Sequence, residues 1–485
     1  MNGSEANQQG RDEEQLRKLG YAQALLRDMG GFANFAVSFS IISILTGAVT
    51  LYGHGLRFGG PFVMLVGWPL VAVMTLLVAA SLAQLASAFP TAGALYHWSA
   101  MLGGPGWGFL TAWLNTLGQF AITAGIDYGL AEFVVAMLGG PSDRSYVLPV
   151  YAGILITHGL LNHVGVTAVS LLNRLSAWYH IVGVALLLGA LMLWAPRQDL
   201  GFLTTRFTSE AYPYSYAFLI ALLQAQWTFT GYDASAHVTE ETRDPGRNAP
   251  WGIFLSVLVS AIVGYVMLLG VTLAIQDLPA TAAASNPFIH ILRTALGEGL
   301  GNALVWIVMG AMWFCGLASI TSNSRMLYAF ARDRGLPLSG YLSRVSPRFR
   351  SPHVAVWAST LCALLVALWA QAYSAMVALS TLALYASYGV PIAIGLWARR
   401  RGVWATRGPW DLGRWSLPIN VLALGWVAVV TVLFVLPPNQ LAGYTFAGAL
   451  VALGLYWALY MRRSFTGPPV TLAGFRKVET ASLAR

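Results

Sequence analysis

The chain reads WTFTGYDASAHVTEETRDPGRNAP from Trp227 to Pro250, and the interpretation of the fold turns on this stretch. An apolar run enters it, Gly231 and Asp233 follow where hydrocarbon would surround a membrane helix, and charged residues end it. A carboxylate inside a membrane helix is costly, so Asp233 is expected to face a cavity or a polar partner. The stretch therefore predicts a membrane helix that is interrupted near its middle and leaves the bilayer through its charged end.

The composition places the whole chain in the membrane class. Of its 485 residues, 57% are hydrophobic and 10% charged, with a mean hydropathy of +0.62, whereas a soluble protein carries about a quarter charged residues. Apolar runs of about 20 residues, long enough to cross a bilayer core of roughly 30 Å, recur along the chain. We expect an all-α integral membrane protein with about twelve spans, at residues 33–55, 61–85, 107–137, 147–164, 168–194, 215–237, 251–275, 302–329, 354–371, 375–397, 418–436 and 442–461.

Basic residues are distributed unevenly between the two sides of this membrane. If both termini share one side, only five of the 28 Lys and Arg residues fall on the other: Arg57, Arg144, Arg197, Arg206 and Arg293. The positive-inside rule then predicts a multi-pass protein with both termini in the cytoplasm, and we expect it in the plasma membrane. The same distribution accounts for the net charge of +9, so membrane lipids are expected as neighbours and nucleic acid is not.

Two hydrophobic segments are interrupted by glycine. The first contains SIISILTGAVTLYGHG (40–55), and the second contains Thr230-Gly231. Counted as five spans per half, these are the first helices of the two halves. Interruptions at corresponding positions indicate a transporter built from inverted repeats, with its binding site near the midplane of the bilayer.

Several stretches resemble the amino acid–polyamine–organocation (APC) superfamily, and within it the amino acid/choline permease branch. The resemblance covers nearly the whole chain and rests on the order and spacing of its motifs. Besides the stretch at 227–250, these are GYAQALLRDMGGFANFAVSFSIISILTG (20–47), ASLAQLASAFPTAGALYHWSAMLGGPGWGFLTAWLN (80–115), SNSRMLYAFARDRGLP (322–337) and LYASYGVPI (384–392). The resemblance implies twelve helices: ten form a five-plus-five inverted repeat, with helices 1 and 6 unwound around the substrate, and two more follow at the C-terminus.

Four regions are expected on this interpretation. They are a cytoplasmic N-terminal tail (1–30), a ten-helix transport core (31–398), helices 11 and 12 (399–462) and a cytoplasmic C-terminal tail (463–485). Leucines in the first region suggest a short helix lying on the membrane surface. They are Leu16, Leu19, Leu25 and Leu26.

The unwound part of helix 1 is the expected site for a substrate carboxylate. A broken helix leaves N–H groups at the start of one half and carbonyls at the end of the other, and these ends attract a carboxylate and an ammonium respectively. The resemblance implies that a Gly–small–Gly run holds the carboxylate, and here that run aligns with Leu45, Thr46 and Gly47. Because its first glycine is missing, we expect Gly47 and the Thr46 hydroxyl to bind the carboxylate, with backbone help from Ser43 and Ile44.

Helix 6 supplies the remaining core of the expected site. The candidate residues are Trp227, Phe229, Thr230, Gly231 and Asp233. The resemblance implies a gating aromatic in this stretch, a role for Trp227 or Phe229. Asp233 has two compatible roles: contact with a substrate ammonium or a gate, or a cap in which its side chain accepts backbone N–H bonds at the start of the lower half-helix.

Helices 3 and 5 add polar candidates. Gln119 and Thr123 lie near mid-bilayer in helix 3 and are expected to contact the substrate. His180 in helix 5 falls where several APC members carry a lysine. A histidine there could load and unload a proton or stand in for a sodium ion. A sodium site is the alternative, formed by hydroxyl groups of the expected helix 8. The hydroxyl groups belong to Ser319, Thr321 and Ser322.

The expected function is secondary transport that imports an amino acid or a γ-aminobutyrate-like zwitterion, coupled to protons. One alternative is a permease for a cationic amine such as choline or ethanolamine, in which Asp233 with Trp227, Phe229 and Tyr232 would form an anionic aromatic cage. Another is a nutrient sensor that binds its ligand without moving it. An enzyme is not expected, because no nucleophile–base pair stands out, and neither a cofactor nor a metal site is predicted.

Overall fold

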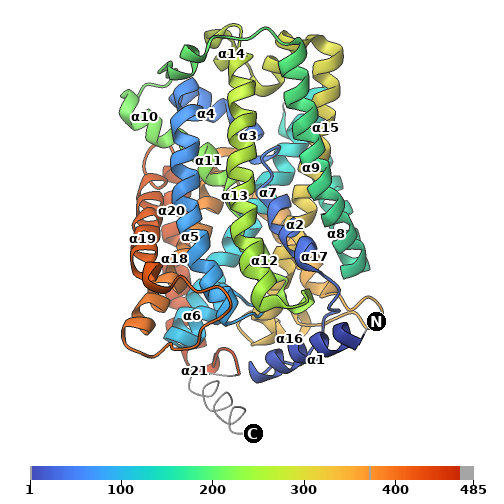
Figure 1. The fold of residues 1–485 in the computed structure, drawn as a ribbon, viewed down its shortest axis with the longest axis vertical. Helices are drawn as coiled ribbons and strands as arrows, with labels where there is room; N and C mark the ends of the chain where they lie inside the picture. Colours follow the sequence, from blue (N-terminus) through green and yellow to red (C-terminus); the bar gives the residue numbers. More distant parts are fainter. Residues whose placement is uncertain (1–2, 142, 371–372, 470–485) are drawn as a thin grey trace.

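The protein is a bundle of long helices (Figure 1). The computed structural model describes residues 3–141, 143–370 and 373–469, and nine helical segments in that part of the chain are long and apolar enough to cross a membrane. The predicted all-helical membrane class is therefore confirmed. The helices of these segments are α5 (Trp68–Ala88), α7 (Pro105–Met137), α8 (Arg144–Val164), α9 (Val166–Trp194), α13 (Pro245–Leu273), α15 (Pro287–Arg332), α18 (Tyr373–Arg400), α19 (Ser416–Leu433) and α20 (Gln440–Tyr456). A shorter apolar helix, α17 (His353–Trp369), accompanies them.

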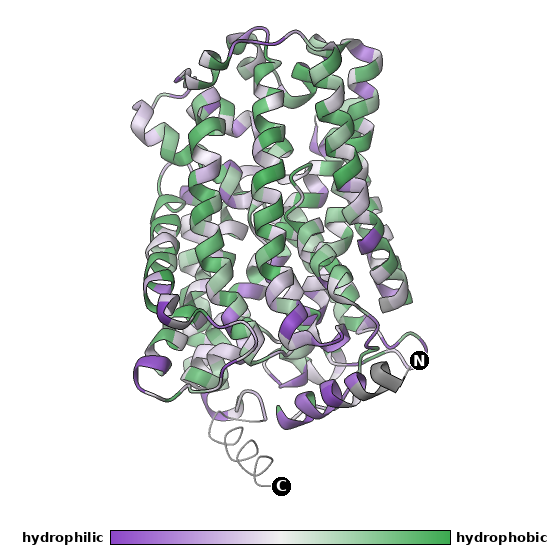
Figure 2. Cartoon of the chain, viewed as in Figure 1, coloured by the Kyte–Doolittle hydropathy of each residue, from purple (hydrophilic) through white to green (hydrophobic). Residues whose placement is uncertain are grey.

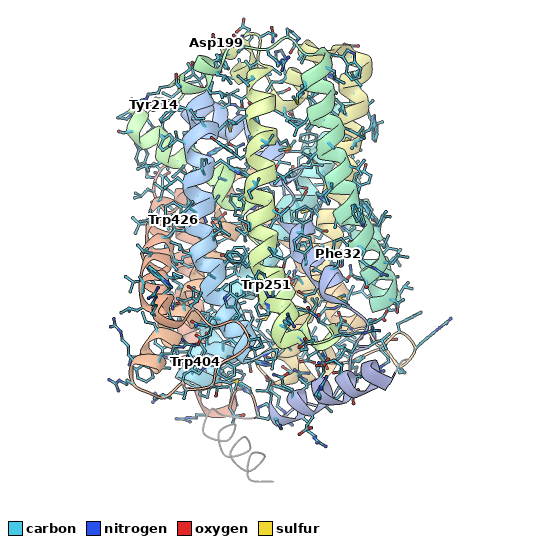
Figure 3. The ribbon with its side chains drawn as sticks, in the orientation of Figure 1. Phe32, Asp199, Tyr214, Trp251, Trp404 and Trp426 are labelled. Atoms are coloured by element: carbon cyan, nitrogen blue, oxygen red, sulfur yellow. The ribbon has the colours of Figure 1, made fainter. Side chains whose placement is uncertain are left out.

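The outside of the bundle is apolar along most of its length, and hydrophilic residues gather towards its two ends (Figure 2). Phe32 and Trp251 mark this periphery (Figure 3) and are 44% and 46% exposed. An apolar band between two polar ends is the surface that a bilayer requires. The end that carries α1 (Gly3–Lys18) is called the α1 face below, and the opposite end, which carries α14 (Leu278–Ala283), is called the α14 face.

Two segments of the bundle are broken into short helices. The first consists of α2 (Gly31–Ile41), α3 (Gly47–Thr50) and α4 (Tyr52–Gly59). The second consists of α10 (Tyr214–Ala221), α11 (Leu223–Thr228) and α12 (Ala234–His237). Its break contains Gly231 at φ +84°, a conformation that glycine adopts at no steric cost. Both breaks fall beside the glycines that the sequence singled out.

α15 is longer than one crossing of a membrane requires. Its 46 residues include Gly297 in a non-helical conformation, with φ 76° and ψ 165°. This residue separates a short first part from a long second part, and the span predicted at 302–329 lies within the second part. The glycine therefore ends one helix and allows the next to start in a new direction.

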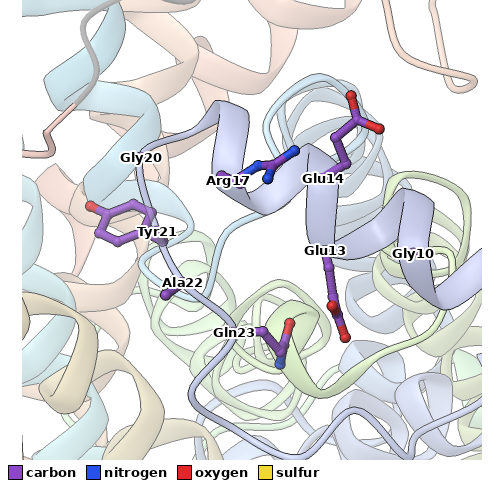
Figure 4. A pocket seen from close by; sticks show the side chains of 8 residues that line it. All are labelled: Gly10, Glu13, Glu14, Arg17, Gly20, Tyr21, Ala22 and Gln23. Atoms are coloured by element: carbon purple, nitrogen blue, oxygen red, sulfur yellow. The ribbon is translucent and has the colours of Figure 1, made fainter.

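The N-terminal segment lies across the α1 face (Figure 1). Its helix α1 is present, but Leu16 and Leu19 are each 2% exposed and Leu25 is fully buried. These leucines pack against the protein, not on a lipid surface as their pattern suggested. Residues 19–29, which follow α1, are called the strap below. Figure 4 shows the hollow between α1 and the strap. The hollow is lined by Gly10, Glu13, Glu14, Arg17, Gly20, Tyr21, Ala22 and Gln23. Most of the predicted C-terminal tail, residues 470–485, lies outside the described residues.

Hydrogen bonds tie the strap to the end of the second broken segment. The N–H groups of Asp28 and Met29 donate to the Glu241 carbonyl oxygen at 3.1 and 2.9 Å. Nearer α1, Tyr21 Oη donates to Asp333 Oδ2 at 2.6 Å, and His97 Nε2 lies 3.0 Å from the same oxygen. Burial opposes ionisation of Asp333, but the contacts with His97 and Tyr21 outweigh it and hold the pKa of the carboxyl below its usual value. The strap is therefore anchored by charge as well as by backbone pairing.

Candidate functional site

The two broken segments meet inside the bundle. A Cβ atom placed on Gly47 at the start of α3 would lie 2.8 Å from Thr228 Cα at the end of α11, so the two backbones are almost in contact there. The N–H groups of Thr46 and Gly47 both donate to the Ser43 carbonyl at 2.9 Å. Gln224 Nε2 donates to the Ala48 carbonyl at 3.0 Å and links α11 to α3. The start of α3 is thus held directly against the end of α11.

Side chains from other helices satisfy the backbone of the second break. Tyr385 Oη of α18 donates to the Phe229 carbonyl at 2.8 Å, and Gly231 N donates to Tyr388 Oη at 3.2 Å. Ser38 Oγ of α2 donates to the Tyr232 carbonyl at 2.8 Å. Unpaired backbone groups at membrane depth cost several kcal/mol each, so α2 and α18 stabilise the break.

A small cavity lies where the half-helices meet. Its volume is about 10 Å³, which is roughly the space that one water molecule requires. A molecule larger than water can enter only if the half-helices or the neighbouring helix α7 move apart. The residues that line the cavity are Ile41, Thr46, Gly47, Ile122, Ile126, Trp227, Thr228 and Cys315.

Asp233 is fully buried and is held by three side chains from three parts of the chain. Tyr388 Oη donates to its Oδ1 at 2.8 Å, Asn115 Nδ2 donates to its Oδ2 at 3.0 Å, and His237 Nε2 lies 3.1 Å from Oδ2. Asp233 occupies the N-cap position of α12, but its side chain makes no capping bond to a backbone N–H. The structural role considered from sequence, a side-chain cap, is therefore wrong. The carboxylate instead joins α7, α12 and α18.

His180 of α9 is connected to Thr46 through Ser43. Thr46 Oγ1 donates to Ser43 Oγ at 2.7 Å, and Ser43 Oγ lies 2.7 Å from His180 Nε2. On its other side, His180 Nδ1 lies 2.8 Å from the Ser176 carbonyl. Because a carbonyl oxygen can only accept a hydrogen bond, Nδ1 carries the hydrogen. Nε2 of the neutral ring then accepts a hydrogen bond from the Ser43 hydroxyl. The chain of contacts joins a cavity residue to a titratable group that lies outside the cavity lining.

Gln119 and Thr123 of α7 face α15. Gln119 Nε2 donates to Ser322 Oγ at 3.2 Å, and Thr123 Oγ1 lies 2.7 Å from Ser319 Oγ. Ile122 and Ile126 of the same helix line the cavity in their place. The structure therefore places both polar candidates at the α7–α15 contact and outside the cavity lining.

Among the remaining predicted site residues, one lines the cavity and the others contact neighbouring parts of the protein. Trp227 lines the cavity, and its Nε1 donates to Ser380 Oγ of α18 at 3.0 Å. Phe229 packs on Trp68 with 4.6 Å between ring centroids. Thr230 Oγ1 donates to the Trp227 carbonyl at 2.6 Å, and Ile44 is directed towards Gly264 of α13. Of the predicted set, the structure brings Thr46, Gly47 and Trp227 together at the cavity.

Sequence reasoning missed several residues around the cavity and the breaks. Cys315, Ile122 and Ile126 belong to apolar runs that carry no polar signal. Tyr385 and Tyr388 were detectable, because they lie three residues apart in the motif LYASYGVPI and so share one face of a helix. That face is directed at the second break.

This chain is similar in sequence to known proteins over most of its length. Residues 30–459 match the family model described as amino acid permease. The chain is 37% identical to the amino-acid permease BAT1 of Arabidopsis thaliana, over 93% of this chain and 95% of that protein. It is 38% identical to the BAT1 homolog of Oryza sativa subsp. japonica, over 95% and 96% of the two chains. It is 27% identical to the GABA-specific permease of Saccharomyces cerevisiae, over 95% and 86%.

Proposed function

The chain belongs to the amino acid permease family of the APC superfamily, and from this premise we propose that it imports an amino acid or a γ-aminobutyrate-like zwitterion by proton-coupled alternating access. It is a multi-pass membrane transporter and not an enzyme. The observation that carries the proposal is the meeting of two broken segments at Thr46, Gly47 and Thr228. Such a meeting offers helix ends to both charges of a zwitterion.

The proposed topology counts each broken segment as one crossing. Together with the nine long helices and α17 this gives twelve crossings, of which the first ten (31–398) form a five-plus-five inverted repeat and the last two lie within 399–462. The distribution of Arg and Lys supports placing both termini in the cytoplasm of a cell whose plasma membrane the protein spans. The α1 face is then cytoplasmic and the α14 face external.

The two faces of the bundle differ in what covers them. The strap and α1 cover the α1 face, while a hollow of about 390 Å³ lies on the side of the α14 face, bordered by Arg57, Glu132 and Tyr373. The rings of Trp227 and Tyr373 meet edge to face, with centroids 6.2 Å apart. Trp227 lines the central cavity and Tyr373 borders the outer hollow. We assign this pair as the outer gate.

The engagement of Asp233 favours a zwitterion over a cationic amine. Asn115, Tyr388 and His237 already contact both carboxylate oxygens, so the carboxylate is not free to form an anionic cage. Thr46 and Gly47 place the N-terminal end of α3 at the cavity, and the partial positive charge of a helix N-terminus attracts a substrate carboxylate. Transport in this family member thus relies on helix ends for the substrate charges and on Asp233 for joining the helices that move.

The experiment that tests this function is uptake of labelled γ-aminobutyrate into proteoliposomes under an imposed inward proton gradient. A panel of neutral amino acids, choline and ethanolamine competes with the label. We expect inhibition by zwitterions and none by the two amines, because the cavity offers sites for a carboxylate. Inhibition by choline or ethanolamine with the amino acids inert would contradict the zwitterion assignment and favour the cationic-amine permease. Saturable binding of the amino acids with no uptake would favour the sensor.

We propose His180 of α9 as the group that couples transport to protons. Its link through Ser43 to Thr46 places a titratable ring beside the break between α2 and α3. The three α15 hydroxyls considered for sodium already form hydrogen bonds. Ser319 pairs with Thr123, Ser322 with Gln119, and Thr321 with Asn162 at 2.8 Å. We expect His180→Ala to abolish uptake driven by a pH gradient. Exchange of labelled for unlabelled substrate at equal pH is expected to persist in this variant. Gradient-driven uptake at the wild-type level in His180→Ala would remove His180 from the mechanism.

A further inference from the structure

A further buried acid–histidine pair lies where α7, α8 and α15 pack against one another. Asp127 Oδ2 of α7 is 3.1 Å from His158 Nδ1 of α8, and both side chains are fully buried. Neither residue is among those that line the central cavity. The pair is separate from the Asp233–His237 contact, which involves α12.

Each partner of this pair keeps one polar atom without a hydrogen bond. These atoms are Asp127 Oδ1 and His158 Nε2. Oδ1 is directed at Gly316 of α15, where a Cβ atom would lie only 1.8 Å from it, so the absence of a side chain at Gly316 makes room for the carboxylate. Buried polar atoms are nearly always paired. The carboxylate oxygen and the ring nitrogen left without partners are therefore available to bind a proton.

The other ionisable groups around the pair do not balance its charge. Tyr151 Oη donates to the Ala363 carbonyl at 2.8 Å, and the Cys315 thiol is directed at the Ile41 carbonyl at 3.3 Å. Both groups are neutral near pH 7 at their ordinary pKa values. Further along the helices lie Glu132 and Tyr373 at the outer hollow, and Arg325, which is engaged with Glu241. The net charge at this position is therefore set by Asp127 and His158 themselves.

We propose that Asp127 and His158 together form a proton-binding site of the transporter, distinct from His180. The inference rests on the proposed function, since it adds a second proton-binding site to the coupling that we assign to His180. With an ionised carboxylate and a neutral imidazole the pair bears one negative charge. One bound proton makes the pair neutral overall, as imidazolium and carboxylate or as imidazole and carboxylic acid. An uncompensated charge in a low-dielectric interior is costly, and one bound proton removes that charge.

The pair is placed to act on the central cavity. One turn along α7 from Asp127, Thr123 contacts Ser319, which lies one turn along α15 from Gly316. Cys315, beside Gly316, lines the cavity. Loss of the proton leaves a net charge against Gly316 that favours entry of water and separation of α7 from α15. The closed contact is therefore stabilised by the proton, and its opening releases the proton.

The test uses the full-length transporter in proteoliposomes, with labelled γ-aminobutyrate as the probe and the isosteric variant Asp127→Asn. We expect accumulation driven by an inward proton gradient to fall by about tenfold or more, the size of a typical coupling between two ligands. Exchange of labelled for unlabelled substrate at equal pH needs no net proton movement and is expected to persist. Asp199→Asn, on an exposed loop of the α14 face, is the matched control and is expected to accumulate substrate like the wild type.

A second measurement does not depend on transport. Infrared difference spectra of the wild type, titrated between about pH 4 and 9 to cover carboxyl and imidazole groups, are compared with those of Asp127→Asn and His158→Gln. We expect a carboxyl or imidazole signal in the wild type that both variants lack. Wild-type accumulation by Asp127→Asn, or spectra without such a difference, would overturn the inference. If no zwitterion is taken up or exchanged even by the wild type, the proposed function fails, while the spectra still decide whether the pair binds a proton. Should Asp127→Asn fail to fold, His158→Gln serves in both measurements.

Discussion

Arg325→Ala is expected to destabilise the folded protein by about 3–5 kcal/mol, the cost of removing one partner from a buried ion pair. Both Arg325 and Glu241 are fully buried, and Arg325 Nη2 lies 3.0 Å from Glu241 Oε1. Arg325 Nη1 also donates to Ser324 Oγ at 3.1 Å. Without the guanidinium, the Glu241 carboxylate would remain buried and uncompensated. Thermal unfolding of the purified protein in detergent measures the loss.

The ion pair also anchors the strap, since the Glu241 carbonyl accepts from Asp28 and Met29. The control is Arg407→Ala: Arg407 is 74% exposed in its pair with Asp411, and exposed pairs contribute about 0–1 kcal/mol. A double variant, Arg325→Met with Glu241→Met, is expected to recover part of the stability because it leaves no unpaired charge. Equal unfolding temperatures for Arg325→Ala and Arg407→Ala would contradict the assignment.

The broken segments were predictable because their signals are local. Gly47 and Gly231 interrupt apolar runs, and an interruption at membrane depth requires a cavity or polar partners. Two partners of Asp233 were not predictable, because Asn115 lies 118 residues away and Tyr388 lies 155 away. A buried carboxylate shows in the sequence that it needs partners, but only tertiary packing determines which residues supply them.

The orientation of α7 shows a second limit. Its residues are apolar on most sides, so no face is marked as the one towards the cavity. Thr123 was chosen for its polarity, yet Ile122, one position earlier and about 100° around the helix, lines the cavity. The leucines of α1 show a similar limit: their pattern predicts an apolar surface, but not whether lipid or protein covers it. Here Leu16 and Leu19 pack into the protein.

Gly47→Ala is expected to abolish uptake while much of the protein still folds. The new methyl group would meet Thr228 Oγ1 at 2.6 Å and Thr228 Cα at 2.8 Å. Overpacking of this kind costs about 1–3 kcal/mol, which the bundle can relieve only by moving α3 away from α11. That movement separates the helix ends that we assign to the two charges of the substrate. Uptake of labelled γ-aminobutyrate, normalised to folded protein by size-exclusion chromatography, measures the effect.

Two further variants separate this cause from a general effect of replacing glycine. Gly448→Ala in α20 has nothing within 4 Å of the added methyl group and favours a helix by about 1 kcal/mol, so its uptake is expected to match the wild type. Thr228→Ala combined with Gly47→Ala removes the hydroxyl, but the added methyl group still collides with the backbone of residue 228. The double variant is therefore expected to stay inactive. Full uptake by Gly47→Ala alone would show that the close approach of the two backbones at Thr228 is not required for transport.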